Sequence, residues 1–265
     1  MRLLLLAFPL LLLTSCKTLF GPKGPELLWA DEFDGHEPPD GSKWAYDIGG
    51  KGWGNNELQH YTNRPENVRL LSGKLMIEAH KEDYEGNKYT SARVVTRGKH
   101  EFLPGTRIIV RAKLPAGRGT WPAIWMLGGN IKEAGWPLCG EIDIMEHVGY
   151  APDTVYSTVH TKAVNHIIGN AKSGTATAID YETNFHEYRL DWHEDRLEFF
   201  VDGRRMHVYP KIEGATAEQW PFDKPQYLLL NLAVGGNWGG RNGVDETIWP
   251  QRLEVDWVRA FKIKD

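Results

Sequence analysis

Cysteine is scarce in this chain of 265 residues, which has only Cys16 and Cys139. Two widely separated thiols exclude a fold built on a dense disulfide framework. Basic residues form no cluster, and 31 lysines and arginines against 35 acidic residues give a net charge of −4. A nucleic-acid partner would need a basic surface, so this class of function is also excluded. Internal repeats, low-complexity tracts and any sign of a second large domain are lacking as well.

Long apolar runs are equally rare. The run from residue 3 to 13 follows Met1 and Arg2 and is too short to span a membrane stably, so it indicates a secretory signal. The run ends in Leu13-Thr14-Ser15-Cys16, which resembles the lipobox of bacterial lipoproteins, where cleavage precedes a lipidated cysteine. An ordinary signal peptide with a chance cysteine is the alternative. We therefore expect a signal peptide at 1–15, a lipidated tether at 16–25 and a folded domain at 26–265, exported to the outer membrane on its periplasmic or cell-surface side.

Helical periodicity with caps is absent from the rest of the chain, where short apolar runs alternate with glycine, asparagine, aspartate and proline. This pattern predicts an all-β sandwich, with one short helix near 217–220. Asp202-Gly203 predicts a two-residue hairpin turn. The predicted strands are 74–80, 91–96, 107–114, 123–127, 141–146, 155–160, 186–192, 196–201, 205–208, 227–234 and 254–262.

The segment 140–149 carries three acids within six residues. Regular alternation along a strand would place Glu141 and Asp143 on one face and Glu146 on the other. One extra residue, a β-bulge near Met145, would return Glu146 to the acidic face. Three carboxylates on one strand face repel one another, and folding does not require them to be together. Chemistry that needs one charged carboxylate beside a protonated one does require it.

Two other interpretations of these acids stay open at this point. A solvated sandwich strand can carry acids on its outer face. Glu141, Asp143, Glu146 and His147 could also bind a metal, although consecutive residues of a strand rarely converge on one ion.

Aromatic residues and glycines are plentiful, with 11 Trp, 10 Tyr and 28 Gly. The polar, glycine-rich loop at 52–61 indicates a binding loop because it still carries two aromatic residues. Trp121 lies beside proline and Trp238 among glycines, where few apolar side chains are available to pack against. We therefore predict that both contact a ligand. Trp125 lies in an apolar run that favours the core. His160 ends a predicted strand and is either a site residue or a satisfied strand end.

The segment 141–146 matches the E-x-D-x-x-E signature of family-16 glycoside hydrolases, in the form with one extra residue that is typical of their laminarinase branch. Lichenases have the shorter E-x-D-x-E. The chain resembles this family over about residues 26–264, including WGNNELQHYT, the arginine of Ser91-Ala92-Arg93, WPAIWML, HEYRLDW, VDG and LLLNLAVGGNWGG.

The resemblance implies a β-jelly-roll of two antiparallel sheets whose concave face forms a glycan cleft. It implies that Glu141 is the nucleophile, Glu146 the general acid/base and Asp143 an auxiliary acid. It also implies a structural Ca²⁺ on the convex face, held by Glu32, the carbonyl of Gly73 and Asp256. The residues matching the sugar subsites of the family are Asn56, Arg93, Trp121, Trp125, His160 and Trp238, which moves Trp125 toward a functional role.

Two carboxyl groups suffice to split a glycosidic bond, and positions beside a bulge can bring them to the separation of about 5–5.5 Å found in retaining enzymes. No cofactor is needed for catalysis. We expect a secreted, monomeric endo-acting β-glucanase that hydrolyses internal 1,3-β-D-glucosidic bonds of laminarin-type glucans through a glycosyl-enzyme, with β-glucan and, through Cys16, a membrane as its partners. The alternatives are a mixed-linkage 1,3-1,4-β-glucanase and a non-catalytic glycan-binding lipoprotein.

Overall fold

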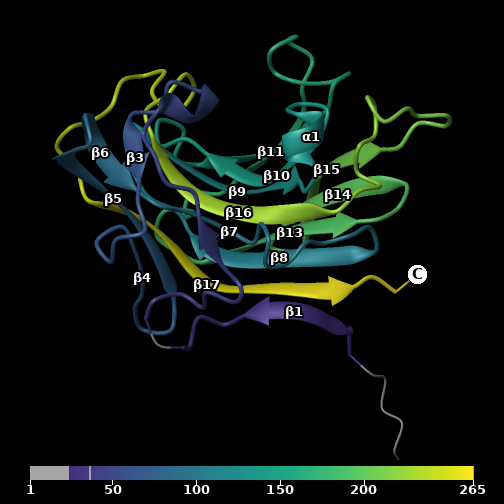
Figure 1. Cartoon of the computed structure of the whole chain (residues 1–265), viewed down its shortest axis with the longest axis horizontal. Coiled ribbons are helices and arrows are strands. Elements are labelled where there is room, and N and C mark those ends of the chain that lie inside the picture. The colour runs from purple at the N-terminus through teal and green to yellow at the C-terminus, as the bar shows by residue number, and fades with distance from the viewer. Residues whose placement is uncertain (1–23, 36, 265) are drawn as a thin grey trace, which may run out of the picture.

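The computed structural model describes residues 24–35 and 37–264 (Figure 1). The predicted signal peptide, Cys16 and most of the predicted tether lie outside the described residues. Within the described part, no helix is both long enough and apolar enough to cross a membrane.

Seven strands form one sheet and ten form a second. The first sheet contains β2 (Ala45–Tyr46), β7 (Arg93–Val95), β9 (Thr120–Gly128), β10 (Glu141–His147), β11 (Thr154–His160), β12 (Lys172–Thr177) and β16 (Gln226–Val234). The second contains β1 (Leu27–Asp31), β3 (Gln59–Tyr61), β4 (Val68–Leu70), β5 (Leu75–Tyr84), β6 (Asn87–Ser91), β8 (Thr106–Lys113), β13 (His186–Trp192), β14 (Arg196–Val201), β15 (Arg204–Pro210) and β17 (Gln251–Lys262). The two helices of the described residues are the 3₁₀ turn η1 (Gly52–Gly54) and α1 (Ile131–Ala134).

The two sheets stack face to face, as the sequence predicted for a jelly-roll sandwich (Figure 1). The seven-stranded sheet has the order β12-β11-β10-β9-β16-β7-β2. The ten-stranded sheet follows the path β15-β14-β13-β8-β17-β5-β6-β3, with β1 beside β17 and β4 beside β5. The described strand pairs are antiparallel except for β3 and β6, which run parallel, so the ten-stranded sheet is mixed.

Most predicted strands are present, and β13 and β14 have the predicted bounds. Asp202 and Gly203 connect β14 to β15 with φ values of 48° and 76°, which confirms the predicted hairpin turn. Strands β1 to β4, β6 and β12 were not predicted. The predicted helix at 217–220 is wrong, because the segment makes a single turn in which Trp220 N donates to Thr216 O at 2.8 Å. Pro221 follows directly and cannot continue a helix.

The core lies between the sheets. Ile124, Ile142 and Leu230 of the seven-stranded sheet face Val110 and Leu190 of the ten-stranded sheet in one buried cluster. Burying each such side chain contributes about 1.5–3 kcal/mol to folding. Because side chains alternate along a strand, the residues between these positions point to the other face of the seven-stranded sheet.

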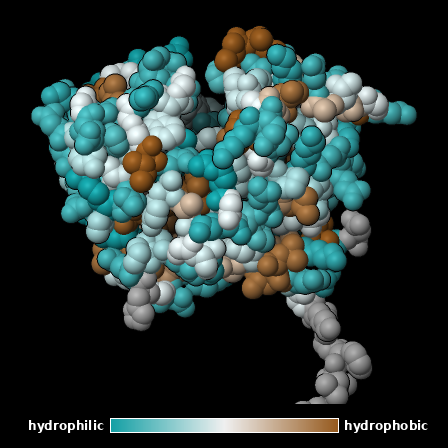
Figure 2. All heavy atoms as spheres, viewed as in Figure 1, coloured by the Kyte–Doolittle hydropathy of each residue, from teal (hydrophilic) through white to brown (hydrophobic). Residues whose placement is uncertain are grey.

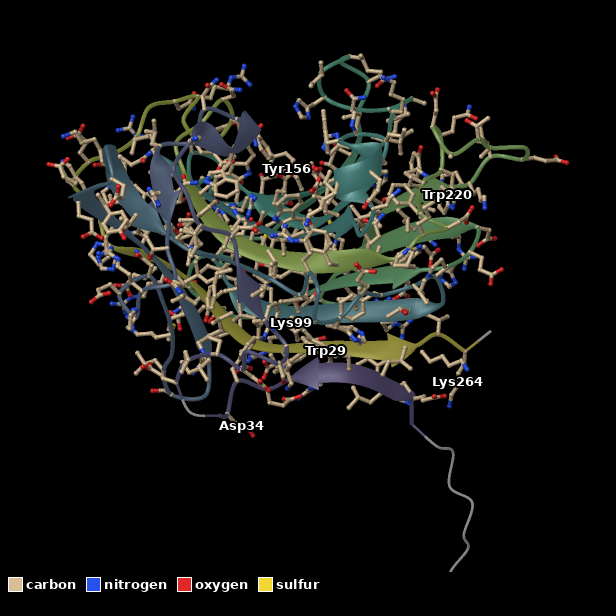
Figure 3. All side chains as sticks on the ribbon, in the orientation of Figure 1. Trp29, Asp34, Lys99, Tyr156, Trp220 and Lys264 are labelled. Atoms are coloured by element: carbon tan, nitrogen blue, oxygen red, sulfur yellow. The ribbon has the colours of Figure 1, made fainter. Side chains whose placement is uncertain are left out.

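That outer face of the seven-stranded sheet is the concave face of the molecule. Loops rise from both ends of the sheet, with η1 at one end and α1 at the other (Figure 1). The surface is hollowed between these two groups of loops (Figure 2). Tyr156 of β11 lies on the side of the hollow, whereas Trp29 lies at the opposite side of the sandwich, beside β1 (Figure 3).

Candidate active site

A β-bulge in β10 brings the three acids onto the concave face. The register of β10 shifts between Asp143 and Met145 against β9, and between Asp143 and Glu146 against β11. The bulge predicted near Met145 is therefore confirmed. The side chain of Met145 is turned into the core, and Glu146 pairs with Ala123 on the face that also holds Glu141 and Asp143.

His147 is separated from the acids by the same bulge. Its Nδ1 lies 2.8 Å from the carbonyl oxygen of Thr154, and the side chain is fully buried. The four-residue metal set that includes His147 is therefore not assembled. His160 takes its place beside the acids, because its ligand atom and those of Glu141 and Asp143 all lie within 4.8 Å of one another.

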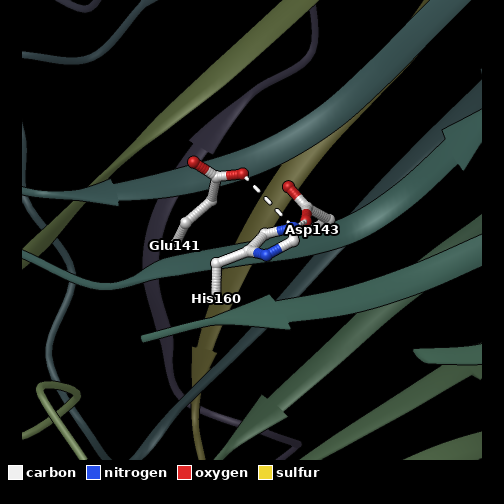
Figure 4. A group of neighbouring side chains, drawn as sticks. All are labelled: Glu141, Asp143 and His160. Carbon is white, nitrogen blue, oxygen red and sulfur yellow. Dashed lines mark ion pairs between the residues drawn. The ribbon is translucent and has the colours of Figure 1, made fainter. Parts of the chain in front are cut away.

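Glu141 and Glu146 each accept a hydrogen bond from a different indole. The indole Nε1 of Trp136 donates to Glu141 Oε2 at 2.8 Å, and Nε1 of Trp121 donates to Glu146 Oε1 at 3.1 Å. His160 Nε2 lies 3.3 Å from Asp143 Oδ2 and 3.7 Å from Glu141 Oε1 (Figure 4). His160 thus belongs to the acid cluster and is more than the end of a strand.

The environment of the acids disfavours their charged forms. Burial, followed by repulsion from Asp143, raises the pKa values of Glu141 and Glu146 to about 8. Burial likewise raises the pKa of Asp143 to about 8. Among the described residues, no lysine or arginine forms an ion pair with any of the three. The cluster therefore holds fewer than three charges at neutral pH, since a first charge raises the pKa values of the remaining acids further.

Glu141 is the acid best prepared to carry that first charge. It accepts the shorter indole hydrogen bond and lies 3.7 Å from His160, although His160 lowers the pKa values of both Glu141 and Glu146. Donors to the charged form of a carboxyl favour ionisation. Glu146 then keeps its proton because it faces an already charged neighbour. The site can therefore present one carboxylate and one carboxylic acid at the same time.

The predicted ligand contacts Asn56, Trp121 and Trp238 lie at one end of the hollow. Asn56 Nδ2 donates to Asn237 Oδ1 at 2.8 Å, which joins the loop at 52–58 to the glycine-rich loop at 235–240. The ring of Trp238 lies edge-on to Trp121, with centroids 5.6 Å apart. These two tryptophans therefore form one aromatic cluster beside Glu146.

Arg93 and Trp125 lie beside each other on the same face. The guanidinium of Arg93 is 5.5 Å from the Trp125 ring and 4.2 Å from the Trp53 ring, and its Nε donates to Asp47 Oδ2 at 3.0 Å. Trp125 is half-buried against a small cluster of Val95, Tyr227 and Leu229 that lies apart from the main core. Trp125 therefore lies on the concave face and outside the main core.

Sequence reasoning missed several residues of the site. Trp136 was not singled out, although it lies in the loop directly before the acid strand. Tyr156 shares the concave face with His160 because they are four residues apart in β11, and its ring centroid is 5.0 Å from that of Trp238. The period of two along this strand could have found Tyr156. His166, whose ring contacts Trp136 and His160 at 5.3 and 5.1 Å, gave no signal of its own.

The three residues assigned to Ca²⁺ lie on the other side of the sandwich. Arg259 donates to both carboxylate oxygens of Glu32, at 2.8 and 2.7 Å, and Arg111 forms an ion pair with Asp256. Gly73 lies in the turn between β4 and β5. Both carboxylates are paired with arginines, so a divalent cation would have to displace these arginines in order to bind here.

The chain is similar to known proteins both in sequence and in structure. The family model described as glycosyl hydrolases family 16 matches residues 55–259. The chain is 49% identical to a β-glucanase of Rhodothermus marinus over 97% of this chain and 93% of that protein. The crystal structure of the laminarinase from Rhodothermus marinus is 48% identical, with a TM-score of 0.88, and the match covers 91% of this chain and 99% of that one.

A further similar structure was crystallised with a glucan. It is a variant of SCLam, described as a non-specific endo-β-1,3(4)-glucanase, and presents a 1,3-β-D-cellobiosyl-glucose at its active site. It is 44% identical, with a TM-score of 0.86, and the match covers 91% of this chain and 96% of that one.

Proposed function

The chain belongs to glycosyl hydrolase family 16, and on that premise we propose that it is a retaining endo-β-glucanase that cleaves internal 1,3-β-D-glucosidic bonds of laminarin-type glucans. The observation that carries this proposal is the arrangement of Glu141 and Glu146 on one face of a bulged strand, with different donors and without a lysine or arginine partner in the part of the chain that the structure describes. The hollow over the seven-stranded sheet is open between its two groups of loops (Figure 2), as endo-cleavage of a polymer requires.

In the first step, the charged carboxylate of Glu141 attacks the anomeric carbon while Glu146 gives its proton to the leaving glycosidic oxygen. The glycosidic bond breaks as an ester bond to Glu141 forms, so the charge on Glu141 disappears. Without that neighbouring charge the pKa of Glu146 falls, and Glu146 can take a proton from the incoming water. Attack of this water releases the sugar and restores both carboxyl groups. Asp143, with His160 beside it, keeps Glu141 in position and tunes its pKa.

Laminarin provides the direct test. We expect the purified protein to release reducing ends and a range of oligosaccharide lengths early in the reaction, and proton NMR should show the β-anomer first. The absence of released reducing ends would support a non-catalytic glycan-binding protein instead. An α-anomer as first product would contradict the retaining mechanism.

Mixed-linkage 1,3-1,4-β-glucan is a second candidate substrate, because the similar protein SCLam is described as non-specific for 1,3(4) linkages. Product analysis on laminarin, lichenan and agarose, at equal enzyme concentration, distinguishes the specificities. Faster cleavage of lichenan than of laminarin would reverse our assignment of the preferred linkage.

We further propose that Cys16 carries a lipid that anchors the protein to the outer membrane. The Leu13-Thr14-Ser15-Cys16 motif supports this proposal. Cys16→Ser should leave the activity unchanged and move the protein from the membrane fraction to the soluble fraction, because the acyl chains and not the folded domain hold it there. Mature protein that starts at a residue other than Cys16 by mass spectrometry would contradict the lipobox.

A structural Ca²⁺ near Glu32, Gly73 and Asp256 stays a proposal that rests on the family resemblance. Binding would require Arg111 and Arg259 to release their carboxylates. If calcium binds there, the melting temperature should rise with added CaCl₂ in the wild type and not in Asp256→Asn. The same melting temperature in CaCl₂ and in EDTA would contradict the site.

A further inference from the structure

Glu57 is a buried acid that lies apart from the three acids of the active site. It is 8% exposed, and burial raises its pKa. Its carboxylate accepts hydrogen bonds from the side chains of Asn55, Gln59 and Tyr61, at 3.2, 2.7 and 3.3 Å. A buried acid with three donors is costly to keep unless it holds something in place. The mechanism proposed above makes no use of it.

A chain of hydrogen bonds connects Glu57 to Trp125. The indole Nε1 of Trp125 donates to Asn231 Oδ1 at 2.7 Å, and Asn231 Nδ2 donates to the hydroxyl of Tyr61 at 3.1 Å. Tyr61 then donates to Glu57 Oε2. An indole can only donate and a carboxylate can only accept, so the two ends fix the orientation of the amide and of the hydroxyl between them. This chain joins three segments, because Trp125 lies in β9, Asn231 in β16 and Tyr61 in β3.

Glu57 also supports the glycine-rich loop at 235–240. The backbone of Glu57 pairs with Gly235, and Gln59 Oε1 accepts a hydrogen bond from Val234 N at 2.7 Å, directly before the loop. A Cβ atom on Gly236 would lie 3.3 Å from Cγ of Glu57 and 3.3 Å from the Trp121 ring. Glycine at 236 therefore lets the loop that carries Trp238 pack closely over the Glu57 side chain.

We propose that Glu57 is a positioning residue for glucan binding, which uses one buried carboxylate to hold both Trp125 and the loop of Trp238. Glu57 does not contact the reacting bond and acts only through these tryptophans. The inference rests on the proposed function, because it assumes that the two tryptophans contact glucan. Interactions that hold the substrate equally in the ground state and in the transition state affect KM and leave kcat unchanged.

Kinetics on laminarin with four variants test this proposal. Glu57→Gln keeps the size of the side chain but places an amide group opposite donors that need an acceptor. Tyr61→Phe removes only the hydroxyl that links Glu57 to Asn231. The double variant tests whether the two residues act as one unit. Glu82→Gln is the matched control, since Glu82 is a glutamate of β5 whose partners are Arg64 and Thr90.

We expect KM to rise about tenfold in Glu57→Gln, which loses hydrogen bonds to a charged carboxylate. We expect a rise of about threefold in Tyr61→Phe, which loses the weaker hydrogen bonds of a hydroxyl. The double variant should resemble Glu57→Gln, because the chain of hydrogen bonds from Glu57 to Trp125 is already broken in Glu57→Gln. In each case kcat should change less than twofold, and Glu82→Gln should match the wild type. A purely structural role would instead reduce the fraction of active enzyme, and so lower the apparent kcat at constant KM.

Unchanged KM values in both single variants, or additive effects in the double variant, would overturn the inference. If Glu57→Gln does not fold, the KM of Tyr61→Phe decides the question alone, and a wild-type value refutes the proposal. Failure of the proposed function gives a different result, because the wild-type protein would then release no reducing ends from laminarin.

Discussion

Carboxylates on the two faces of this sandwich have opposite environments. On the concave face, Glu141 and Glu146 accept indole hydrogen bonds and form no ion pair with a lysine or arginine of residues 24–35 and 37–264, and their pKa values are raised. On the convex face, Arg107 donates to both carboxylate oxygens of Asp191, and Glu78 forms ion pairs with two arginines. Burial raises the pKa of Glu78, but the hydrogen bonds from Arg69 and Arg252 outweigh it and the pKa is lowered.

The difference shows how to distinguish structural acids from catalytic ones in this fold. A structural carboxylate on the sheet is neutralised by arginine or lysine, so its charge is stable over a wide pH range. A carboxylate without such a partner must change its protonation state easily, which costs folding energy but allows proton transfer. Removing an acid from the concave face should therefore lower activity without lowering stability. Removing an acid from the convex face should lower stability without lowering activity.

The largest expected effect is the loss of activity on the concave face. Glu146→Gln and Glu141→Ser should each lower kcat on laminarin by several orders of magnitude, about 10³-fold or more, because each removes a group that takes part in bond cleavage. The melting temperature should not fall. Glu254→Gln on the convex face, where the partner is Lys113 at 2.6 Å, is the matched control and should keep full activity.

Azide distinguishes the two roles on the concave face. It should rescue Glu146→Ala on an activated substrate by attacking the glycosyl-enzyme, and the product should be a β-glycosyl azide. Wild-type activity in Glu141→Ser or Glu146→Gln would contradict the assignment of these two residues as the catalytic pair.

Removing an aromatic side chain should have the next largest effect. We expect Trp238→Ala to reduce kcat/KM on laminarin about tenfold to a hundredfold, since losing one stacked ring costs about 1–3 kcal/mol. Trp238 lies among aromatic rings over the concave face and outside the main core, so the melting temperature should barely move. Trp257→Ala on the convex face, which removes a ring that Arg259 covers at 4.1 Å, should leave kcat/KM unchanged. If Trp238→Ala unfolds the protein, Trp238 is a core residue.

An acid of the convex face should matter for stability alone. Asp191→Asn leaves Arg107 and Arg189 without their carboxylate and should lower the free energy of unfolding by about 1–3 kcal/mol. Urea denaturation measures this change. The kcat on laminarin should stay at the wild-type value, and a hundredfold loss of kcat in a folded variant would break the distinction between the two faces.

The smallest effect concerns pH. The folded protein raises the pKa of Glu146 from 4.5 to about 8, so it keeps a proton that the unfolded chain releases. Stability from this group is present below pH 4.5 and is lost as the pH rises toward 8. Glu146→Gln should therefore gain melting temperature relative to the wild type as the pH rises from 5 to 8, by about 2–4 °C for each kcal/mol of stability.

Glu78→Gln should behave in the opposite way. The pKa of Glu78 is lowered on folding, so its contribution is present above the unfolded pKa and is lost as the pH falls through the folded value. The deficit of Glu78→Gln relative to the wild type should therefore shrink in acid. Parallel pH curves for both variants would show that the two faces do not differ in the way described.

Local pattern in the sequence determined most of the longer strands and the acid face. Alternation along 141–146 and the extra residue before Glu146 were enough to predict the bulge and the common face of Glu141, Asp143 and Glu146, because both follow from the geometry of a single strand. The Asp202-Gly203 turn was predictable for the same reason. The helix predicted at 217–220 failed where Pro221 limits the segment to one turn.

Only the tertiary structure decided which side chains serve these acids. Trp121 reaches Glu146, Trp136 reaches Glu141, and Glu57 holds Trp125 through Asn231, a residue of a different strand. The sequence marked Trp121 and Trp125 as aromatic residues of one short run but gave no sign that the first donates to an acid and the second to an amide. The contact of Trp121 spans 25 positions and that of Trp136 only five, but Trp125 and Asn231 are 106 positions apart and are brought together by strand order in the sheet. No local pattern encodes that proximity, because it arises only when the two sheets close around their common core.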